Sequence, residues 1–233
     1  MTEKIIFKKF LIIQKRVLNH DVFSIKVKPI DGILGEVPVS SFFYIKNDEE
    51  CKRPYTPVLV ENGTIKFVIK IYENGKLSNF LNEKRVGDII DVSNVQMKLK
   101  YEKGKEKILM IAGGTGITPM LQIIQSAKAN NEKTIFKVIF CNKTKNDIFL
   151  EEEIKKYSID IIHVLEKTDG GDYKGFITEE IIKKNLDGVD FIYVCGPYMM
   201  VKNVCGNKTQ KDQGEIEGML KNIGIKKDMV YKF

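Results

Sequence analysis

The chain contains no tryptophan and only two histidines, His20 and His163, in 233 residues. Its four cysteines form no C-x-x-C pair: Cys51, Cys141, Cys195 and Cys205. Zinc and iron–sulfur sites are built from clustered cysteines and histidines, so this spacing argues against a metal centre and we expect none. Isolated thiols of this kind favour a reducing compartment.

Long apolar runs are also missing. No stretch is long and apolar enough to span a bilayer, and the first nine residues carry no apolar core of a signal peptide. We therefore expect a cytoplasmic chain without a membrane span, and we expect a monomer.

The net charge of +7 comes from scattered lysines, with no arginine-rich arm and no basic run interleaved with aromatic residues. This pattern argues against a nucleic-acid partner. A positive surface instead favours an acidic protein as partner, because opposite charges steer the two molecules together.

Short segments with strand-like alternation fill residues 1–103, which predicts a first domain with an antiparallel β-barrel. Asn62-Gly63 marks a tight hairpin turn, since both residues accept a positive φ at low cost. The expected strands cover residues 7–16, 22–28, 41–46, 56–60, 64–72 and 89–92, and a short helix is expected over 77–83.

Strands and helices alternate over residues 104–233, which predicts a second domain with a parallel sheet covered by helices on both faces. The charged stretch 101–107 is the expected linker. The expected strands cover 108–112, 136–141, 159–165, 191–195 and 229–233, and helices are expected over 119–129, 150–157, 178–185 and 215–222.

A glycine-rich turn, Gly113 to Gly116, joins the apolar strand 108–112 to a helix whose first turn contains Pro119. Such a turn directs free backbone N–H groups and the positive end of a helix dipole towards one point, which suits a phosphate. The spacing is not the G-x-G-x-x-G dinucleotide pattern, so a purely structural turn fits these residues equally well.

Three further stretches carry residue types that suit a nucleotide cofactor. Arg53-Pro54-Tyr55-Thr56 combines a planar cation for phosphates, an aromatic face and a hydroxyl that both donates and accepts, as a flavin requires. Gly75 to Ser78 precedes a possible helix and offers N–H groups to a pyrophosphate, or Ser78 simply caps that helix. Cys195-Gly196-Pro197 ends an apolar strand, where open α/β sheets bind ligands. An ordinary strand after a proline and a buried cysteine before a turn are the plain structural alternatives.

In this order, the stretches resemble the NADH–cytochrome b5 reductase family of the ferredoxin-reductase superfamily. The resemblance covers nearly the whole chain and rests on these runs: RPYTPV (53–58), VIKIY (68–72), GKLSNFL (75–81), VGDII (86–90), MIAGGTGITPMLQII (110–124), FCNKTKNDIFL (140–150), GFITEE (175–180), VCGP (194–197) and the terminal Phe233. It implies a two-domain flavoprotein, with FAD in an N-terminal β-barrel over residues 1–103. A C-terminal α/β domain over residues 104–233 would then bind NADH.

For the flavin, the resemblance implies Arg53 on the phosphates, Tyr55 against the ring and Thr56 near the ring atom N5. Pro54 lies between them in the same motif. The other positions that it implies are Val68 and Lys70 on a flavin-contacting strand, Lys76, Leu77 and Ser78 at the pyrophosphate, Thr118 beside the flavin, and Phe233 over the flavin's other face.

For NADH, the resemblance implies a dinucleotide loop and a cysteine beside the nicotinamide. Asp147 matches an acidic residue associated with preference for NADH, because a carboxylate accepts from a ribose 2′-hydroxyl and repels a 2′-phosphate. Lys143 and Lys145 lie close by in sequence and would soften this preference. The loop consists of Gly113, Gly114, Thr115 and Gly116, and the nicotinamide position of Cys195, Gly196 and Pro197.

The implied reaction is hydride transfer from NADH to FAD, with Thr56 and Cys195 nearest the reacting atoms, followed by single-electron transfer to an acidic haem protein such as cytochrome b5. The reductase component of an oxygenase, or a diaphorase with quinone or ferric acceptors, is the alternative enzyme. A nucleotide-binding module without redox chemistry, or a basic RNA-binding protein, is the alternative of another class.

The sequence departs from the family pattern in three places. Ser40-Ser41 replaces the family's usual Gly-Gln, and residues 94–101 replace its usual glycine-proline loop, which leaves FMN open beside FAD. Residues 205–214 read as a polar insertion.

Overall fold

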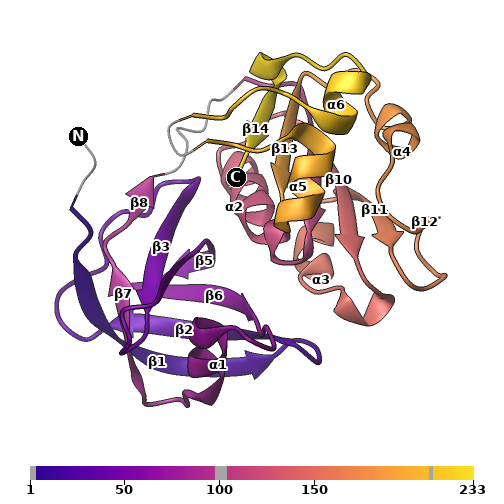
Figure 1. Cartoon of the computed structure of the whole chain (residues 1–233). Coiled ribbons are helices and arrows are strands. Elements are labelled where there is room, and N and C mark those ends of the chain that lie inside the picture. The colour runs from indigo at the N-terminus through magenta and orange to yellow at the C-terminus, as the bar shows by residue number, and fades with distance from the viewer. Residues whose placement is uncertain (1–3, 98–103, 210–211) are drawn as a thin grey trace. The chain divides into compact units, whose positions relative to one another are not determined.

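Figure 1 shows the chain as a computed structural model, which describes residues 4–97, 104–209 and 212–233. The chain divides into two compact units, Met1–Tyr101 and Glu102–Phe233. Each unit has its own sheet and its own hydrophobic core. Residues 101–103, the first three of the predicted linker, lie outside the described residues, so the predicted boundary between residues 103 and 104 stays a prediction.

Unit 1 is an antiparallel sheet that curls into a half-open barrel (Figure 1). Its neighbouring strands follow the order β4-β3-β7-β1-β2-β6-β5, and β8 pairs with β3. The predicted N-terminal β-barrel is thereby confirmed. The elements are β1 (Phe7–Val17), β2 (Val22–Pro29), β3 (Ser41–Lys46), β4 (Lys52–Tyr55), β5 (Pro57–Glu61), β6 (Thr64–Lys70), α1 (Lys76–Glu83), β7 (Ile89–Ser93) and β8 (Gln96–Met97).

The core of unit 1 follows from the alternation of side chains along its strands. In β3, Phe43 and Ile45 are buried while the residues between and beside them are less so, and β6 turns Phe67 and Ile69 into the same core. Helix α1 adds the fully buried Leu81 to this cluster. The helix is therefore part of the barrel's packing rather than an appendage.

Lys15 on β1 holds the C-terminal end of α1. Its Nζ donates to the carbonyl oxygen of Lys84 at 2.9 Å and also to that of Asn82. Carbonyls at the end of a helix lack helical donors, and a lysine can satisfy them. The same ammonium lies 4.7 Å from the centroid of the Phe23 ring. Lys15 thus ties the C-terminal end of α1 to the barrel.

Unit 2 is a six-stranded sheet in the order β12-β11-β10-β9-β13-β14, and all its neighbouring pairs are parallel. The predicted C-terminal α/β domain is confirmed. The elements are β9 (Lys107–Gly113), η1 (Gly114–Gly116), α2 (Ile117–Ala129), β10 (Ile135–Asn142), η2 (Lys145–Asp147), α3 (Glu151–Lys155), β11 (Asp160–Leu165), β12 (Tyr173–Lys174), α4 (Glu179–Lys183), β13 (Phe191–Cys195), α5 (Tyr198–Cys205), α6 (Gly218–Asn222), η3 (Lys227–Met229) and β14 (Val230–Lys232).

Helices cover both faces of this sheet, as predicted. On one face, Ile182 of α4, Val204 of α5 and Leu220 of α6 join a core with Leu109 and Ile111 of the strand β9. Helix α2 lies on the other face together with α3 (Figure 1). Strand β9 is buried along almost its whole length, as expected of a strand covered on both sides.

Some element bounds differ from those expected. Helix α1 begins at Lys76, so Gly75 and not Ser78 is its N-cap residue. Helix α5 was not predicted, because Gly196-Pro197 reads as a turn and hides the helix behind it. Cys205 is the last residue of α5, so the irregular segment begins at residue 206, and α6 begins at Gly218 rather than at residue 215.

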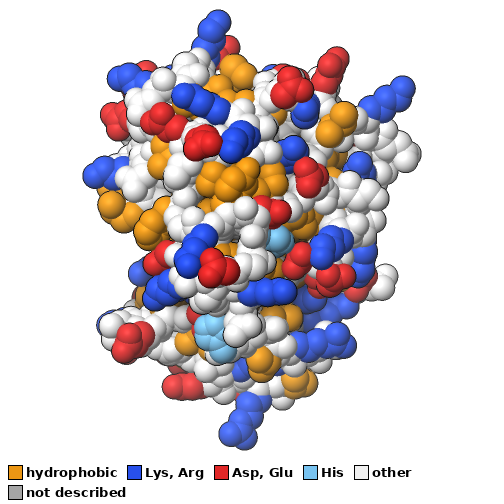
Figure 2. Space-filling view, turned by 90° about the vertical axis from the view of Figure 1, so that its right-hand side faces the viewer, with side chains coloured by type: hydrophobic (Ala, Val, Ile, Leu, Met, Phe, Trp, Pro, Cys, Tyr) orange, Lys and Arg blue, Asp and Glu red, His pale blue; other side chains and the backbone are white. Residues whose placement is uncertain are grey.

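None of the helices in the described parts of the chain combines the length and apolar character needed to cross a bilayer. The surface in Figure 2 carries Lys and Arg side chains interspersed with Asp and Glu. On this face the basic side chains form no single continuous patch, as expected from lysines that are scattered along the sequence.

Candidate functional site

The carboxyl ends of three neighbouring strands meet at one edge of unit 2. Strand β9 lies between β10 and β13, and its register pairs Gly113 with Cys141 and Ala112 with Cys195. The loops after these strands therefore lie side by side. They carry the predicted glycine turn and the predicted Cys195 stretch, so the structure brings these two stretches together where open α/β sheets bind ligands.

Glycines let the two loops pack backbone against backbone. A Cβ on Gly116 would lie 2.1 Å from the carbonyl oxygen of Cys195, and a Cβ on Gly196 would lie 3.0 Å from the amide nitrogen of Gly113. A Cβ on Gly113 would lie 2.7 Å from Sδ of Met200. Close approach of the backbone, rather than a positive φ, therefore requires glycine at Gly116, while the side chains of Met200 and Pro197 crowd Gly113 and that of Met200 crowds Gly196.

The glycine turn leads directly into α2 and leaves room for a ligand. Thr118 is buried and donates from Oγ1 to the carbonyl oxygen of Thr115 at 3.0 Å, which fixes the turn. Gly114 has a φ of +51°, and an added Cβ there would meet nothing within 4 Å. The N–H of Ile117, the first residue of α2, donates to the carbonyl oxygens of Gly114 and Thr115. Open space thus adjoins a turn at the start of a helix, an arrangement that fits the pyrophosphate of a nicotinamide dinucleotide.

An aromatic ring lies beside Cys195 at the same edge. The register of β13 and β14 brings Phe233 level with Cys195, and the Phe233 N–H donates to the carbonyl oxygen of Val194 at 3.0 Å. The Phe233 ring centroid lies 5.6 Å from that of Tyr193 and 5.1 Å from that of Tyr231. Cys195 is half-buried and in no disulfide. A thiol and an aromatic face therefore stand together in unit 2.

Asp147 has a structural role in the fold. Its Oδ2 accepts from the N–H of Thr144 at 2.9 Å and from the Thr144 hydroxyl at 2.6 Å, which forms a capping box at η2. The side chain is almost fully buried. Its predicted contact with a ribose stays a prediction.

Glu166 is a carboxylate at the edge that sequence reasoning missed. It follows the last residue of β11 directly, is half-buried, and donates its N–H to the carbonyl oxygen of Asn142 at 3.0 Å, at the end of β10. The signal that could have identified it is an acidic residue directly after an apolar strand of a parallel sheet.

The predicted flavin motif lies on β4 and just beyond it. Arg53 and Pro54 are exposed, whereas Tyr55 packs on the barrel core with its ring 6.4 Å from that of Phe67. Burial raises the pKa of the Tyr55 phenol, so the ring stays neutral. Within the described ranges, no side chain or backbone group hydrogen-bonds the hydroxyl of the half-buried Thr56. Arg53 Nη1 donates to the carbonyl oxygen of Lys52 at 2.8 Å, which leaves the other guanidinium donors exposed. An exposed cation, a fixed ring and an available hydroxyl fit a flavin nucleotide.

The first turn of α1 fits a pyrophosphate as well. The N–H groups of Lys76, Leu77 and Ser78 are the first three of the helix and have no helical acceptor. Ser78 Oγ donates to the carbonyl oxygen of Gly75 at 3.1 Å and accepts from the N–H of Tyr72 at 3.2 Å. The Ser78 side chain therefore shapes the turn, while the backbone N–H groups remain available to phosphate oxygens. The exposed Lys76 ammonium lies 3.4 Å from Glu49 Oε2 in an exposed ion pair.

Val68 and Lys70 lie on β6, on the face away from the barrel core. Phe67 and Ile69 belong to that core, so alternation along the strand turns Val68 the other way. The Lys70 ammonium pairs with the Asp21 carboxylate at 2.6 Å. The flavin and dinucleotide contacts implied for Val68 and Lys70 stay predictions.

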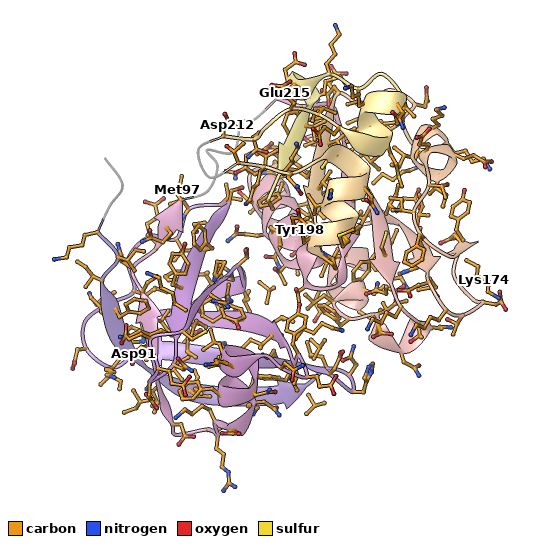
Figure 3. The ribbon with its side chains drawn as sticks, in the orientation of Figure 1. Asp91, Met97, Lys174, Tyr198, Asp212 and Glu215 are labelled. Carbon is orange, nitrogen blue, oxygen red and sulfur yellow. The ribbon has the colours of Figure 1, made fainter. Side chains whose placement is uncertain are left out.

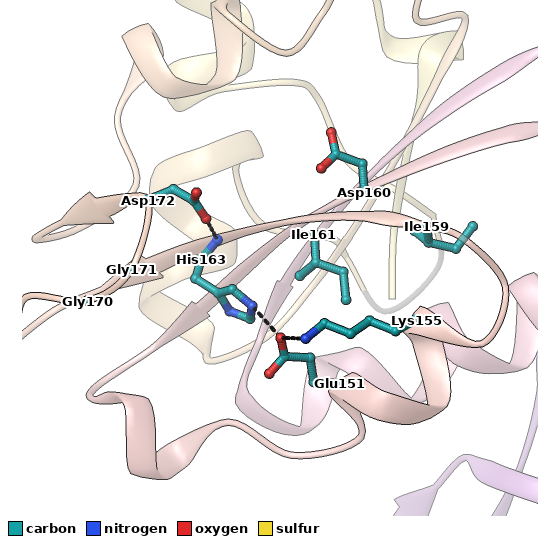
Figure 4. Close-up of a pocket in the computed structure, with 9 residues that line it drawn as sticks. All are labelled: Glu151, Lys155, Ile159, Asp160, Ile161, His163, Gly170, Gly171 and Asp172. Carbon is teal, nitrogen blue, oxygen red and sulfur yellow. Dashed lines mark hydrogen bonds and ion pairs between the residues drawn. The ribbon is translucent and has the colours of Figure 1, made fainter.

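A separate pocket of about 400 Å³ lies between α3 and β11 (Figure 4). Glu151 Oε1 lies 2.6 Å from Lys155 Nζ and 3.3 Å from His163 Nε2, and the His163 N–H donates to Asp172 at 2.7 Å. Burial alone would raise the pKa of Glu151, but Lys155 and His163 outweigh it and the pKa is lowered. These contacts join α3 to β11, and none of the predicted site residues lines this pocket.

Comparison with known proteins agrees with this geometry. Residues 9–101 match the oxidoreductase FAD-binding domain family, and residues 110–206 match the oxidoreductase NAD-binding domain family. Fold and site together define the class: an oxidoreductase that binds FAD through unit 1 and a nicotinamide dinucleotide through unit 2.

Curated relatives narrow the class to one family. The chain is 34% identical to NADH-cytochrome b5 reductase 2 of Mycosarcoma maydis over 97% of its own length and 72% of the relative's. It is 38% identical to NADH-cytochrome b5 reductase 2 of Lodderomyces elongisporus over 88% of its own length and 74% of the relative's. The chain belongs to the NADH–cytochrome b5 reductase family, and it is an NADH-dependent, FAD-containing reductase.

Solved structures show the same fold. The CS-b5R domains of human Ncb5or, in the NAD+ form, match with a TM-score of 0.84 and 25% identity over 99% of this chain and 70% of that one. The cytochrome b5 reductase domain of Ulva prolifera nitrate reductase matches with a TM-score of 0.77 and 25% identity over 97% of both chains.

Proposed function

We propose that this reductase passes the electrons of NADH, one at a time, to an acidic haem protein of the cytochrome b5 type. The observation that carries the proposal is the match, over 97% of the chain, to a reductase named for that haem protein. The net charge of +7 supports an acidic partner, because complementary charge raises the rate of encounter. The cytoplasmic location and the monomeric state stay predictions.

FAD supplies the conversion from two-electron to one-electron chemistry when it is bound. Arg53 and the first turn of α1 would hold its phosphates, and Tyr55 would support its ring. The Thr56 hydroxyl can donate or accept at the ring edge, whichever the redox state requires. No side chain needs to act as a general base, because the hydrogen leaves NADH together with its electron pair.

In unit 2, the glycine turn at the start of α2 would hold the dinucleotide phosphates. Cys195 and Phe233 flank the nicotinamide end of the same edge, where they would orient the ring that donates the hydride. The flavin contact that the resemblance implies for Phe233 stays a prediction. Hydride transfer requires a fixed approach of two rings, so the contribution of these residues is orientation.

We propose that Glu166, rather than the capped Asp147 alone, selects NADH over NADPH. Glu166 stands at the end of β11 and is less buried than Asp147. A carboxylate there would accept from a ribose 2′-hydroxyl and repel a 2′-phosphate.

The acceptor is tested by stopped-flow mixing of the NADH-reduced protein with oxidised cytochrome b5, with ferricyanide and a quinone as parallel acceptors. We expect rapid haem reduction that slows as ionic strength rises, because salt screens the attraction between opposite charges. Reduction of ferricyanide or quinone without reduction of the haem protein would overturn the proposed acceptor.

A further inference from the structure

Lys232 is a cation buried in the core of unit 2. Its side chain is 0% exposed, and its Nζ donates to the carbonyl oxygen of Glu215 at 2.7 Å and to that of Asn207 at 3.3 Å. Burial lowers the pKa of this lysine. A buried ammonium is costly unless its protons are satisfied, so the two carbonyls are what allow it to stay there.

Both carbonyls belong to the irregular segment between α5 and α6, which sequence reasoning left without a role. Gln213 in the same segment accepts, through Oε1, the backbone N–H of Lys232. Strand β14 is the last strand of the sheet, so this contact satisfies an edge N–H that would otherwise be open. Figure 3 labels Asp212 and Glu215 on the part of this segment that runs beside β14.

The segment has its own internal order where the structure describes it. Asp212 Oδ1 accepts from the N–H of Gly214 at 2.6 Å and from the hydroxyl of Thr209 at 2.9 Å. These hydrogen bonds lower the pKa of Asp212, so it stays charged. The described residues of the segment, 206–209 and 212–217, therefore supply the anchor for Lys232.

Lys232 stands next to Phe233 but on the opposite face of the strand. Val230 and Lys232 face the helices α5 and α6, since Val230 belongs to that core and Cys205 interacts electrostatically with Lys232. Alternation turns Phe233 to the face of Tyr231, level with Cys195. The contacts of Lys232 thus lie on one side of β14, and the aromatic ring of the next residue lies on the other side.

We propose that Lys232 is a positioning residue, whose ammonium clamps the C-terminal strand to the segment between α5 and α6 and thereby fixes the Phe233 ring beside Cys195. The inference rests on the proposed role of that edge in nicotinamide binding. In this proposal the segment between α5 and α6 holds the C-terminal strand in place. Lys232 does not contact NADH and affects its binding only by positioning Phe233.

A double-mutant cycle with Lys232→Met and Phe233→Ala tests this claim. Methionine keeps the length of the side chain and removes its donors. We expect Lys232→Met to change the KM for NADH by about three- to tenfold, in the same direction as Phe233→Ala, with a smaller change in kcat. The effects should not add in the double variant, because residues that act through one another are coupled.

Hydrogen exchange supplies a readout that needs no turnover. In Lys232→Met, the amides of residues 232 and 233 should exchange faster, while those of β9 keep their protection. Lys232→Gln retains an amide donor, so its KM for NADH should lie between those of Lys232→Met and the wild type. It serves as the test variant if the methionine variant does not fold. Lys227→Met is the matched control, because Lys227 pairs with the Glu215 side chain at 2.7 Å on the exposed surface.

Additive effects on KM, or unchanged exchange at residues 232 and 233, would overturn the positioning role. A wild-type protein whose flavin is not reduced by NADH would contradict the proposed function itself, so the two failures are distinguishable.

Discussion

Gly116 offers a sharp test of the dinucleotide site, because its replacement by alanine has a calculable steric cost. The added Cβ would lie 2.1 Å from the carbonyl oxygen of Cys195, 2.5 Å from its carbonyl carbon and 2.9 Å from the amide nitrogen of Gly196. All three are backbone atoms and cannot swing away. The φ of Gly116 is −59°, so alanine adds no backbone strain of its own.

Carbon atoms prefer separations of about 3.5–4.0 Å, so Gly116→Ala must push the two loops apart by roughly 1 Å. Overpacking of this kind costs about 1–3 kcal/mol of stability. A misplacement of about 1 Å at a reacting centre can slow the reaction by about 100-fold. We therefore expect a lower Tm for Gly116→Ala. We also expect its rate of flavin reduction by NADH to fall by roughly one to two orders of magnitude.

The assay is anaerobic stopped-flow reduction of the bound flavin by NADH. Unit 1 has its own core, so Gly116→Ala should purify with full flavin content. Gly35→Ala is the control, because a Cβ at Gly35 would meet nothing within 4 Å. A Gly116→Ala protein that is reduced at the wild-type rate would refute the close packing of the two loops.

Four further results are expected. Arg53→Ala should lose FAD during purification, since it removes the exposed cation of the flavin motif, and a variant with full flavin content would count against that role. Lys15→Met should destabilise unit 1 by about 1–2 kcal/mol in denaturant titrations, because it leaves the carbonyls of Asn82 and Lys84 without their donor; an unchanged midpoint would contradict this. Glu166→Gln should raise the NADPH-to-NADH ratio of kcat/KM more than Asp147→Asn does, and the reverse order would restore Asp147 as the selecting residue. The folded-state pKa of Glu151 is lowered from 4.5, so its contribution to stability is present at neutral pH and is lost as the pH falls below that value through the folded pKa; Glu151→Gln should flatten the fall of Tm in this range, and an unchanged slope would contradict it.

The fold could be predicted from the sequence because its patterns are local. Alternation in β3 and the long buried run of β9 follow directly from residue type, and the glycine turn before α2 marks the dinucleotide edge. The close approach of Gly116 to Cys195 could not be predicted in the same way. It depends on β9 and β13 being neighbours in space, although they are far apart in the chain.

Sequence reasoning missed helix α5 and the burial of Lys232, and it could not show the hydrogen bonds of Asp147, whose ribose contact stays a prediction. Helix α5 begins directly after Pro197, and a Gly-Pro pair ordinarily signals a turn. The resemblance implies a ribose contact for Asp147. Only the three-dimensional structure shows that its carboxylate already accepts hydrogen bonds from Thr144. The burial of Lys232 contradicts the usual placement of lysine at surfaces, so no pattern indicates it.

The most direct test of the central claim is an anaerobic titration of the purified yellow protein with NADH. We expect about one equivalent of NADH per bound FAD to bleach the flavin absorbance completely, because one hydride carries both electrons that the flavin takes up. A protein that binds FAD but keeps its oxidised spectrum in the presence of excess NADH would contradict the assignment of unit 2 as the donor of reducing equivalents to unit 1.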